Sequence, residues 1–148
     1  MNQESMDLQV ELGYALIESF SDVNWKKINV SYAHIGSFAE ATCNYADAQG
    51  ATHESGMPAN SIQILRKLKA ATASPEHGAW ISADAVLDRE TSKIHIKFNY
   101  NDKPNWHIDP EPENYLLELG KHPRPQDEVP GWFPIFEDYP NWQDELAK

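Results

Sequence analysis

Residues 93–100 alternate strictly between apolar and polar side chains, and this pattern constrains the fold more than any other. The apolar members of this KIHIKFNY segment are Ile94, Ile96, Phe98 and Tyr100. Successive side chains of a strand point to opposite faces of a sheet, so the segment is predicted to be a half-buried β-strand. Residues 79–87 also alternate. The short loop of residues 88–92 between the two segments predicts an antiparallel hairpin.

A second pair of alternating segments lies earlier in the chain. In residues 27–35 the apolar face carries Ile28, Val30 and Tyr32. Gly36 and Ser37 then offer a turn before residues 38–46, which alternate again. The apolar side of this last segment includes the single cysteine, Cys43, which we expect to be buried and inert. A third short strand at residues 51–54 has a weaker pattern.

Three segments have helical periodicity. Residues 6–20 carry apolar residues at intervals of three to four, with Ser5 as the expected N-cap. The apolar row is Met6, Val10, Gly13 or Tyr14, Ile17 and Phe20. A second helix is expected from residue 60 to Ser74-Pro75, with Arg66, Lys67 and Lys69 mostly on its open face. A third helix fits residues 111–120, and residues 123–134 are expected to be irregular.

These segments predict one α+β domain over residues 1–148. Hairpins with one polar face indicate an antiparallel sheet of about four to five strands, covered on one side by helices. A chain of 148 residues is most simply one domain with one core. Residues 100–148 are too few and too rich in proline to form a separate core, so we expect this segment to pack on the domain.

The C-terminal third has an unusual composition. Residues 101–148 contain eight of the ten prolines, three of the five tryptophans, and eleven acidic residues against four basic ones. This region therefore carries seven of the eleven net negative charges. Proline restricts the backbone, so we expect a stiff, ordered segment with an acidic and aromatic surface. Such a surface suits the binding of a basic protein.

Charge and hydropathy narrow the range of partners and compartments. A net charge of −11 and a pI near 4.8 disfavour binding to nucleic acid and to anionic membranes. No apolar run approaches the ~20 residues needed to cross a bilayer. No basic residue precedes the first apolar residues, so a signal peptide is not indicated and we expect a cytoplasmic protein. A basic macromolecule is the electrostatically favoured partner.

The sequence predicts no catalytic residues, no metal site and no cofactor. The six histidines form no metal-binding spacing, and a single cysteine excludes a multi-cysteine zinc site. Common nucleotide-binding and acyl-transfer motifs are missing. The acidic residues of 109–113 alternate with prolines, which forbids the flexible turn of a calcium loop. These carboxylates instead suit the entry to the third helix.

Several motifs in the second half of the chain resemble those of the YezG-like immunity proteins of bacterial polymorphic toxin and contact-dependent inhibition systems. They are FNYND (Phe98–Asp102), the acidic proline-rich stretch with a tryptophan, YLLEL (Tyr115–Leu119), HPRP (His122–Pro125) and VPGW (Val129–Trp132). The resemblance implies a cytosolic single-domain antitoxin that binds a cognate toxin domain, often a nuclease. It implies no catalytic set.

A toxin-binding surface is therefore expected in the C-terminal third. The residues assigned to it are Asp102, Asp109, Glu111, Glu113, Asp127, Glu128, Trp106 and Trp132. An acidic inhibitor can imitate the charge of nucleic acid toward a basic nuclease, and electrostatic steering accelerates such encounters. Two alternatives remain at this point. One is an acidic adaptor module unrelated to toxins, and the other is a small enzyme that uses carboxylates and histidines.

Overall fold

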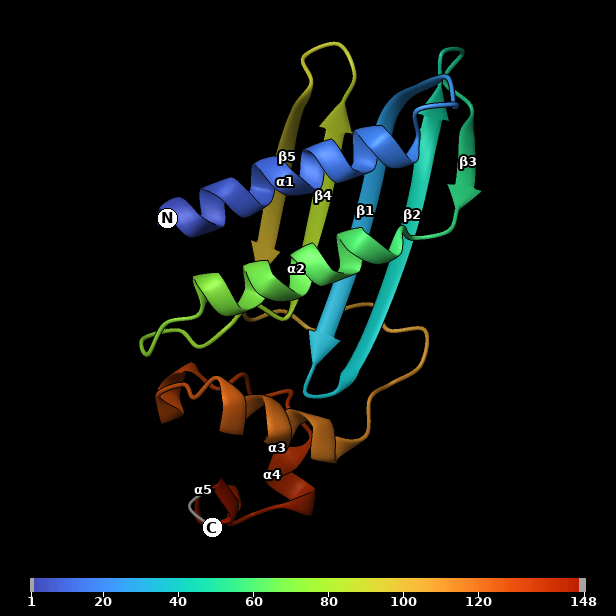
Figure 1. Ribbon diagram of the computed structural model, residues 1–148. Helices are drawn as coiled ribbons and strands as arrows, with labels where there is room; N and C mark the ends of the chain where they lie inside the picture. Colours follow the sequence, from blue (N-terminus) through green and yellow to red (C-terminus); the bar gives the residue numbers. More distant parts are fainter. Residues whose placement is uncertain (1, 147–148) are drawn as a thin grey trace.

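The computed structural model describes residues 2–146 and confirms an α+β fold with a five-stranded antiparallel sheet (Figure 1). The strand order is β3-β2-β1-β4-β5. The strands are β1 (Trp25–Ile35), β2 (Phe38–Asp47), β3 (Thr52–Ser55), β4 (Ser82–Asp88) and β5 (Lys93–Asn99). The helices are α1 (Gln3–Ser19), α2 (Ala59–Thr72), α3 (Pro112–Lys121), the 3-10 helix η1 (Gln126–Glu128), α4 (Ile135–Asp138) and α5 (Trp142–Leu146).

The two predicted hairpins form four adjacent strands of the sheet. β1 pairs with β2 through a turn at Gly36, whose φ of +60° is easily reached only by glycine. β1 also pairs with β4, and β4 pairs with β5. The weakly patterned third strand is present as β3, paired with β2. β4 begins at Ser82, three residues later than predicted from the alternation.

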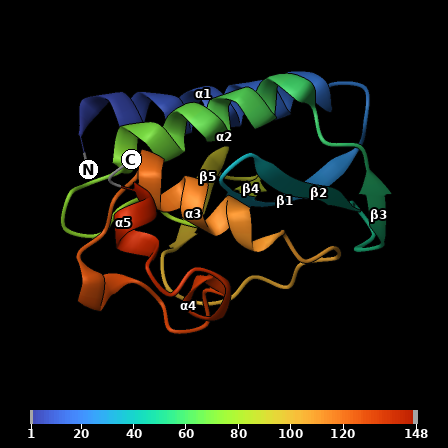
Figure 2. The same cartoon turned by 90° about the horizontal axis from the view of Figure 1, so that it is seen from below.

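One face of the sheet is covered by α1 and α2, which lie side by side across the strands (Figure 2). The predicted inward residues of β1, Ile28, Val30 and Tyr32, are buried in this core, as is Cys43. Ile94, Ile96 and Phe98 lie on the same face but are only half buried. β5 is an edge strand, so these side chains have neighbours on one side only.

The predicted apolar row of α1 is only partly correct, because Gly13 and Phe20 are buried but the other residues near its start are not. Met6, Val10 and Tyr14 are exposed, whereas the buried row contains Leu8, Leu12 and Leu16. The helix also begins earlier than expected, because the Asn2 side chain rather than Ser5 caps it. Asn2 Oδ1 accepts a hydrogen bond from the Ser5 backbone N–H at 2.8 Å.

A second hydrophobic cluster lies at one end of the sheet, where α3, α4 and α5 pack below the β1–β2 turn (Figure 1). Ile35 and Ile81 from the sheet end meet side chains of the C-terminal segment there. The C-terminal members of the cluster are Tyr115, Leu119, Val129, Phe133, Ile135 and Trp142. Residues 123–134, expected to be irregular, contain the 3-10 helix η1, and α4 and α5 follow; these short helical turns bring the apolar side chains onto the cluster.

A buried ion pair joins the two clusters. Lys69, expected on the open face of α2, is 1% exposed, and its ammonium donates to Glu118 Oε1 of α3 at 2.8 Å. Lys69 also donates to the backbone carbonyl of His34 at 2.7 Å, and Glu118 Oε1 accepts the Gly36 N–H at 3.0 Å. The aliphatic stem of Lys69 lies in the core, and the ion pair offsets the cost of burying its charge, although Glu118 Oε2 has no hydrogen-bond partner among the described residues.

Arg124 provides a further link between the C-terminal segment and the sheet. Its guanidinium donates to the carbonyls of Ala79, Tyr100 and Glu128 and to the Asn101 side chain. These four contacts tie residues 79, 100–101 and 128 to one planar group. The Arg124 side chain also passes close to Gly78, whose φ is +68° and where a Cβ would lie 2.5 Å from Arg124 Cγ.

Candidate partner-binding surface

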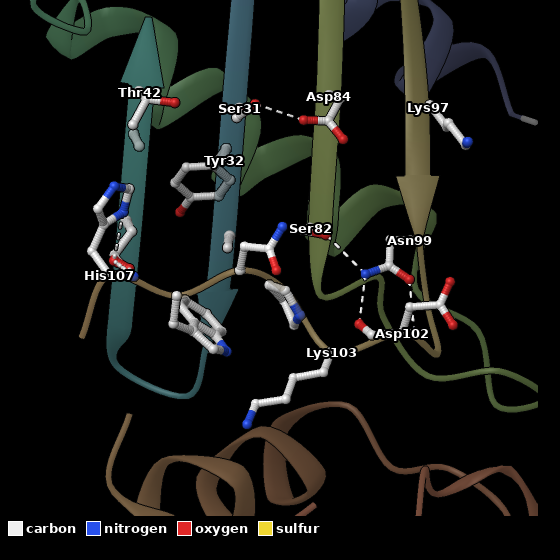
Figure 3. A pocket seen from close by; sticks show the side chains of 16 residues that line it. Ser31, Tyr32, Thr42, Ser82, Asp84, Lys97, Asn99, Asp102, Lys103 and His107 are labelled. Atoms are coloured by element: carbon white, nitrogen blue, oxygen red, sulfur yellow. Dashed lines mark hydrogen bonds and ion pairs between the residues drawn. The ribbon is translucent and has the colours of Figure 1, made fainter. Parts of the chain in front are cut away.

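A pocket of about 460 Å³ lies on the face of the sheet that α1 and α2 leave uncovered (Figure 3). Its floor consists of polar side chains of β1, β2, β4 and β5 that alternate with the side chains facing the core. The floor residues are Ser31, Thr42, Ser82, Asp84, Lys97 and Asn99. One wall is the loop from Asp102 to His107, which crosses the end of the sheet on this face.

The side chain of Asn99 holds the start of this loop. Its Nδ2 donates to the Asp102 carbonyl at 2.7 Å and to Ser82 Oγ at 2.9 Å. Its Oδ1 accepts the Asp102 N–H at 2.9 Å. An asparagine at the end of a strand thereby replaces the backbone pairing that the chain loses as it leaves the sheet.

The other end of the loop is held by β2. Both carboxylate oxygens of Glu40 accept the His107 N–H, at 2.8 and 3.0 Å. Trp106 packs edge-on against Phe38, with 5.6 Å between the ring centroids. The pocket wall is therefore fixed at both ends by side chains of the sheet.

Two polar contacts are formed among the side chains that line the pocket. Ser31 Oγ donates to Asp84 Oδ1 at 2.6 Å, and the ring of His107 faces Glu40 at 3.7 Å. A hydroxyl nucleophile is activated by donating to a histidine, which is not the partner of Ser31 here. The side chains of Asp84, Asp102, Lys97 and Lys103 supply charges of both signs around the opening.

The structure brings only some of the expected site residues together. Asp102 and Trp106 both line the pocket. Asp109, Glu111 and Glu113 are exposed at the beginning of α3. Asp127 is exposed and Glu128 is half buried in η1, beyond the other end of α3. α3 has ten residues and therefore separates the two acidic groups by about 15 Å along its axis.

Hydrogen bonds link the segment that contains Asp127 and Glu128 to the residue before Asp102. Arg124 donates to the Asn101 side chain at 3.2 Å and to the Glu128 carbonyl at 3.1 Å. Trp132 Nε1 donates to the Asn101 carbonyl at 2.7 Å. Residues 101–102 and 127–132 are thus neighbours, although 25 residues of sequence separate Asp102 from Asp127.

Both expected aromatic anchors already contribute to the fold. Trp132 packs edge-on against Tyr115 and Phe133, with ring centroids 5.8 and 4.9 Å apart. Trp106 is half buried against Phe38. Each ring therefore offers only its remaining exposed part to a partner, and its orientation is fixed in advance.

Sequence reasoning missed the floor of the pocket. Ser31, Asp84 and Lys97 lie on three different strands and face each other only because β4 pairs with both β1 and β5. Register places Asp84 opposite Ser31 on one side and Lys97 on the other. The alternation did show that these side chains point away from the core, but strand order was needed to place them together.

Within residues 2–146, no group of three or more His, Cys, Asp or Glu side chains is placed to hold a metal ion. Over the same residues, no helix combines the length and the apolar character needed to cross a membrane.

Comparison of the chain with protein-family models and with curated proteins found no match.

Proposed function

We propose that the protein is an immunity protein, which binds a cognate toxin domain and neutralises it by covering its surface. The toxin is a basic domain, most simply a nuclease. The observation that carries the proposal is an acidic segment held in a defined position. Asp102, Asp109, Glu111, Glu113 and Asp127 are all exposed on it.

Preorganisation makes this segment suitable for tight binding. Hydrogen bonds attach this segment at four places along its length. They involve the side chains of Asn99, Glu40, Glu118 and Arg124. A segment that is ordered before binding loses less conformational entropy on association. The same contacts therefore give a more favourable binding free energy. The resemblance in the FNYND, HPRP and VPGW segments supports the same function.

Electrostatics supports a basic partner. A nuclease presents Lys and Arg to the phosphates of its substrate, so its binding surface complements exposed carboxylates. The pocket is lined by the carboxylates of Asp84 and Asp102 and by the ring of Trp106, which suits the entry of a basic side chain from the partner. Long-range attraction between the two proteins raises the association rate.

Co-expression with an adjacent toxin gene tests the function directly. The protein should restore growth, and the two proteins should copurify. Stopped-flow association with the purified toxin then tests the surface. The double variant Glu111→Lys with Glu113→Lys should slow association at low salt by on the order of tenfold or more.

A matched reversal at the opposite end of the sheet is the control. Asp22 and Glu90 are both exposed in loops of that end. Asp22→Lys with Glu90→Lys changes the net charge equally and should slow association much less. Equal effects of the two double variants would mean that only net charge matters, and the proposed surface would be wrong. A toxin that neither binds nor is neutralised would overturn the function itself.

A further inference from the structure

α1 carries two apolar rows, and only one of them faces the core. Met6, Val10 and Tyr14 are 52%, 56% and 69% exposed. A spacing of four residues places them in one row along the helix. The core row of Leu8, Leu12 and Leu16 already fills the contact with the sheet and α2. The outer row is therefore not required to close the core.

Contiguous exposed apolar side chains on a folded domain typically mark an interaction surface. Scattered single apolar residues are normal, but three large ones in one row are not. Tyr14 also borders a shallow groove of about 280 Å³ between α1 and α2. The groove is lined by Glu11, Tyr14, Ala15, Glu18, Asn60, Gln63, Ile64 and Lys67.

Charge on the same helix indicates the chemistry of the occupant. α1 contains four acidic residues, Glu4, Asp7, Glu11 and Glu18, and no basic residue. All four are exposed. With about 100° per residue, they occupy one side of the outer surface of the helix, next to the apolar row. The surface therefore combines an apolar stripe with an acidic flank.

We propose that the outer face of α1, together with the α1–α2 groove, binds an amphipathic basic helix of a partner protein. The apolar side of that helix covers Met6, Val10 and Tyr14, and its Lys or Arg residues meet the carboxylates of the flank. Helices commonly bind in this way, with their apolar residues laid into a groove between helices.

Other occupants fit the charges less well. Anionic lipid and nucleic acid are repelled by a helix with four carboxylates and no basic residue. A second copy would bring the eight carboxylates of two α1 helices near one contact, and only Lys67 of each copy would line the groove as a basic partner for them. α1 and α2 cover one face of the sheet (Figure 2), whereas the pocket lies on the other face, so the proposal does not depend on the immunity function.

A fluorescent helical peptide of about 18 residues, built from Leu on one face and Lys on the other, is a suitable probe. Fluorescence anisotropy should show saturable binding to the full-length protein. A peptide of the same composition in scrambled order, which has no apolar face, should bind at least about tenfold more weakly. Comparable affinity for both peptides would show that charge alone accounts for the binding, and it would overturn the proposal.

Variants locate the contact. Val10→Ser with Tyr14→Ser should weaken peptide binding by about 30-fold, the effect of losing a hot-spot contact. Glu11→Lys with Glu18→Lys should also weaken it, and increasingly so as salt is lowered. The control is Ile108→Ser with Leu117→Ser, which removes two exposed apolar side chains elsewhere and should leave binding unchanged.

Two further measurements separate the remaining occupants. Sedimentation should show a monomer, and vesicles of phosphatidylcholine with phosphatidylglycerol should not bind the protein. A dimer that Val10→Ser with Tyr14→Ser dissociates would identify a second copy as the occupant. Vesicle binding that the same variant abolishes would identify a membrane. Either result, or unchanged peptide binding in the α1 variants, would overturn the proposal. Thermal melting verifies that each variant is folded.

Discussion

Lys69 of α2 and Glu118 of α3 form an ion pair with a 2.8 Å contact in the interior of the protein. The two residues are 1% and 4% exposed and are separated by 49 positions in the sequence. Lys69 belongs to the helix layer, and Glu118 belongs to the segment that carries the proposed toxin-binding surface. The pair therefore connects the packing of the main core to the position of the acidic surface.

Removing one partner of this pair should destabilise the protein strongly. Lys69→Met leaves a buried carboxylate without its counterion, so the free energy of unfolding should fall by about 3–5 kcal/mol. In the double variant Lys69→Met with Glu118→Gln, the charge is gone and the amide oxygen can still accept the Gly36 N–H. The double variant should therefore be more stable than Lys69→Met alone. Urea denaturation of the wild type, Lys69→Met, Glu118→Gln and the double variant measures this coupling. Strictly additive losses of unfolding free energy would contradict it.

Gly36 should tolerate alanine far less than Gly50 does. Both glycines have positive φ, +60° and +87°, so alanine is strained at each by about 1–2 kcal/mol. A Cβ at Gly36 would additionally overlap the backbone carbonyl of Asn114 in α3, whereas nothing lies within 4 Å of a Cβ at Gly50. Gly36→Ala should cost about 1–3 kcal/mol more than Gly50→Ala. It should also accelerate native-state proteolysis in the 100–111 loop, as measured by limited digestion. Equal stability of the two variants would show that α3 does not pack closely against the β1–β2 turn at Gly36.

Phe133 should behave as a core residue although it lies in the proline-rich segment. It is buried against Tyr115 and Trp132, so Phe133→Ala should lower the free energy of unfolding by about 3–5 kcal/mol. Phe136, three residues later, is exposed, and Phe136→Ala should cost less than about 1 kcal/mol. Chemical denaturation followed by tryptophan fluorescence compares the two. A small effect at Phe133 would mean that the segment contributes little to the fold.

Acidification should destabilise the protein through His34. Burial, and then the nearby charge of Lys69, lower the pKa of His34 from 6.5 to about 3. Below pH 6.5 the unfolded chain therefore binds a proton that the folded protein does not bind. The free energy of unfolding should fall as the pH falls from 6.5 toward 3. His34→Gln should flatten this slope, as urea titrations at several pH values will show.

His122 and Asp47 are the controls for this pH dependence. Burial also lowers the pKa of His122, so His122→Gln should remove a separate part of the same slope. The pKa of Asp47 is lowered chiefly by its hydrogen bond with His53, so its contribution is lost only near and below pH 3.8. An unchanged slope between pH 6 and pH 4 in His34→Gln would contradict the role of His34.

Local patterns in the sequence predicted the strands well. The alternation of Ile28, Val30 and Tyr32 identified both the strand and its buried face, because the period of a strand is two and a one-residue error would reverse every side chain. Gly36 marked the turn between β1 and β2. The predicted fold class follows from these local features, since hairpins with one polar face form antiparallel sheets covered on one side.

The buried side of α1 was decided by tertiary structure. The helix has one apolar row at Met6, Val10 and Tyr14 and another at Leu8, Leu12 and Leu16. Either row fits the period of a helix, so periodicity alone does not select between them. In the fold α1 packs against both the sheet and α2, and the leucine row faces that contact.

The candidate site was predicted only in part. Composition correctly located exposed acidic residues in the C-terminal third, and Asp102 and Trp106 line the pocket. Residues distant in sequence, however, decide how that surface is built: Glu40 holds the loop, Arg124 links it to η1, and Lys69 fixes α3. The sequence by itself determined the local elements and the charge of the surface, because propensity, alternation and charge are properties of neighbouring residues. Only the tertiary structure decided which side chains meet, because strand order and long-range packing bring together groups whose separation along the chain carries no signal of contact.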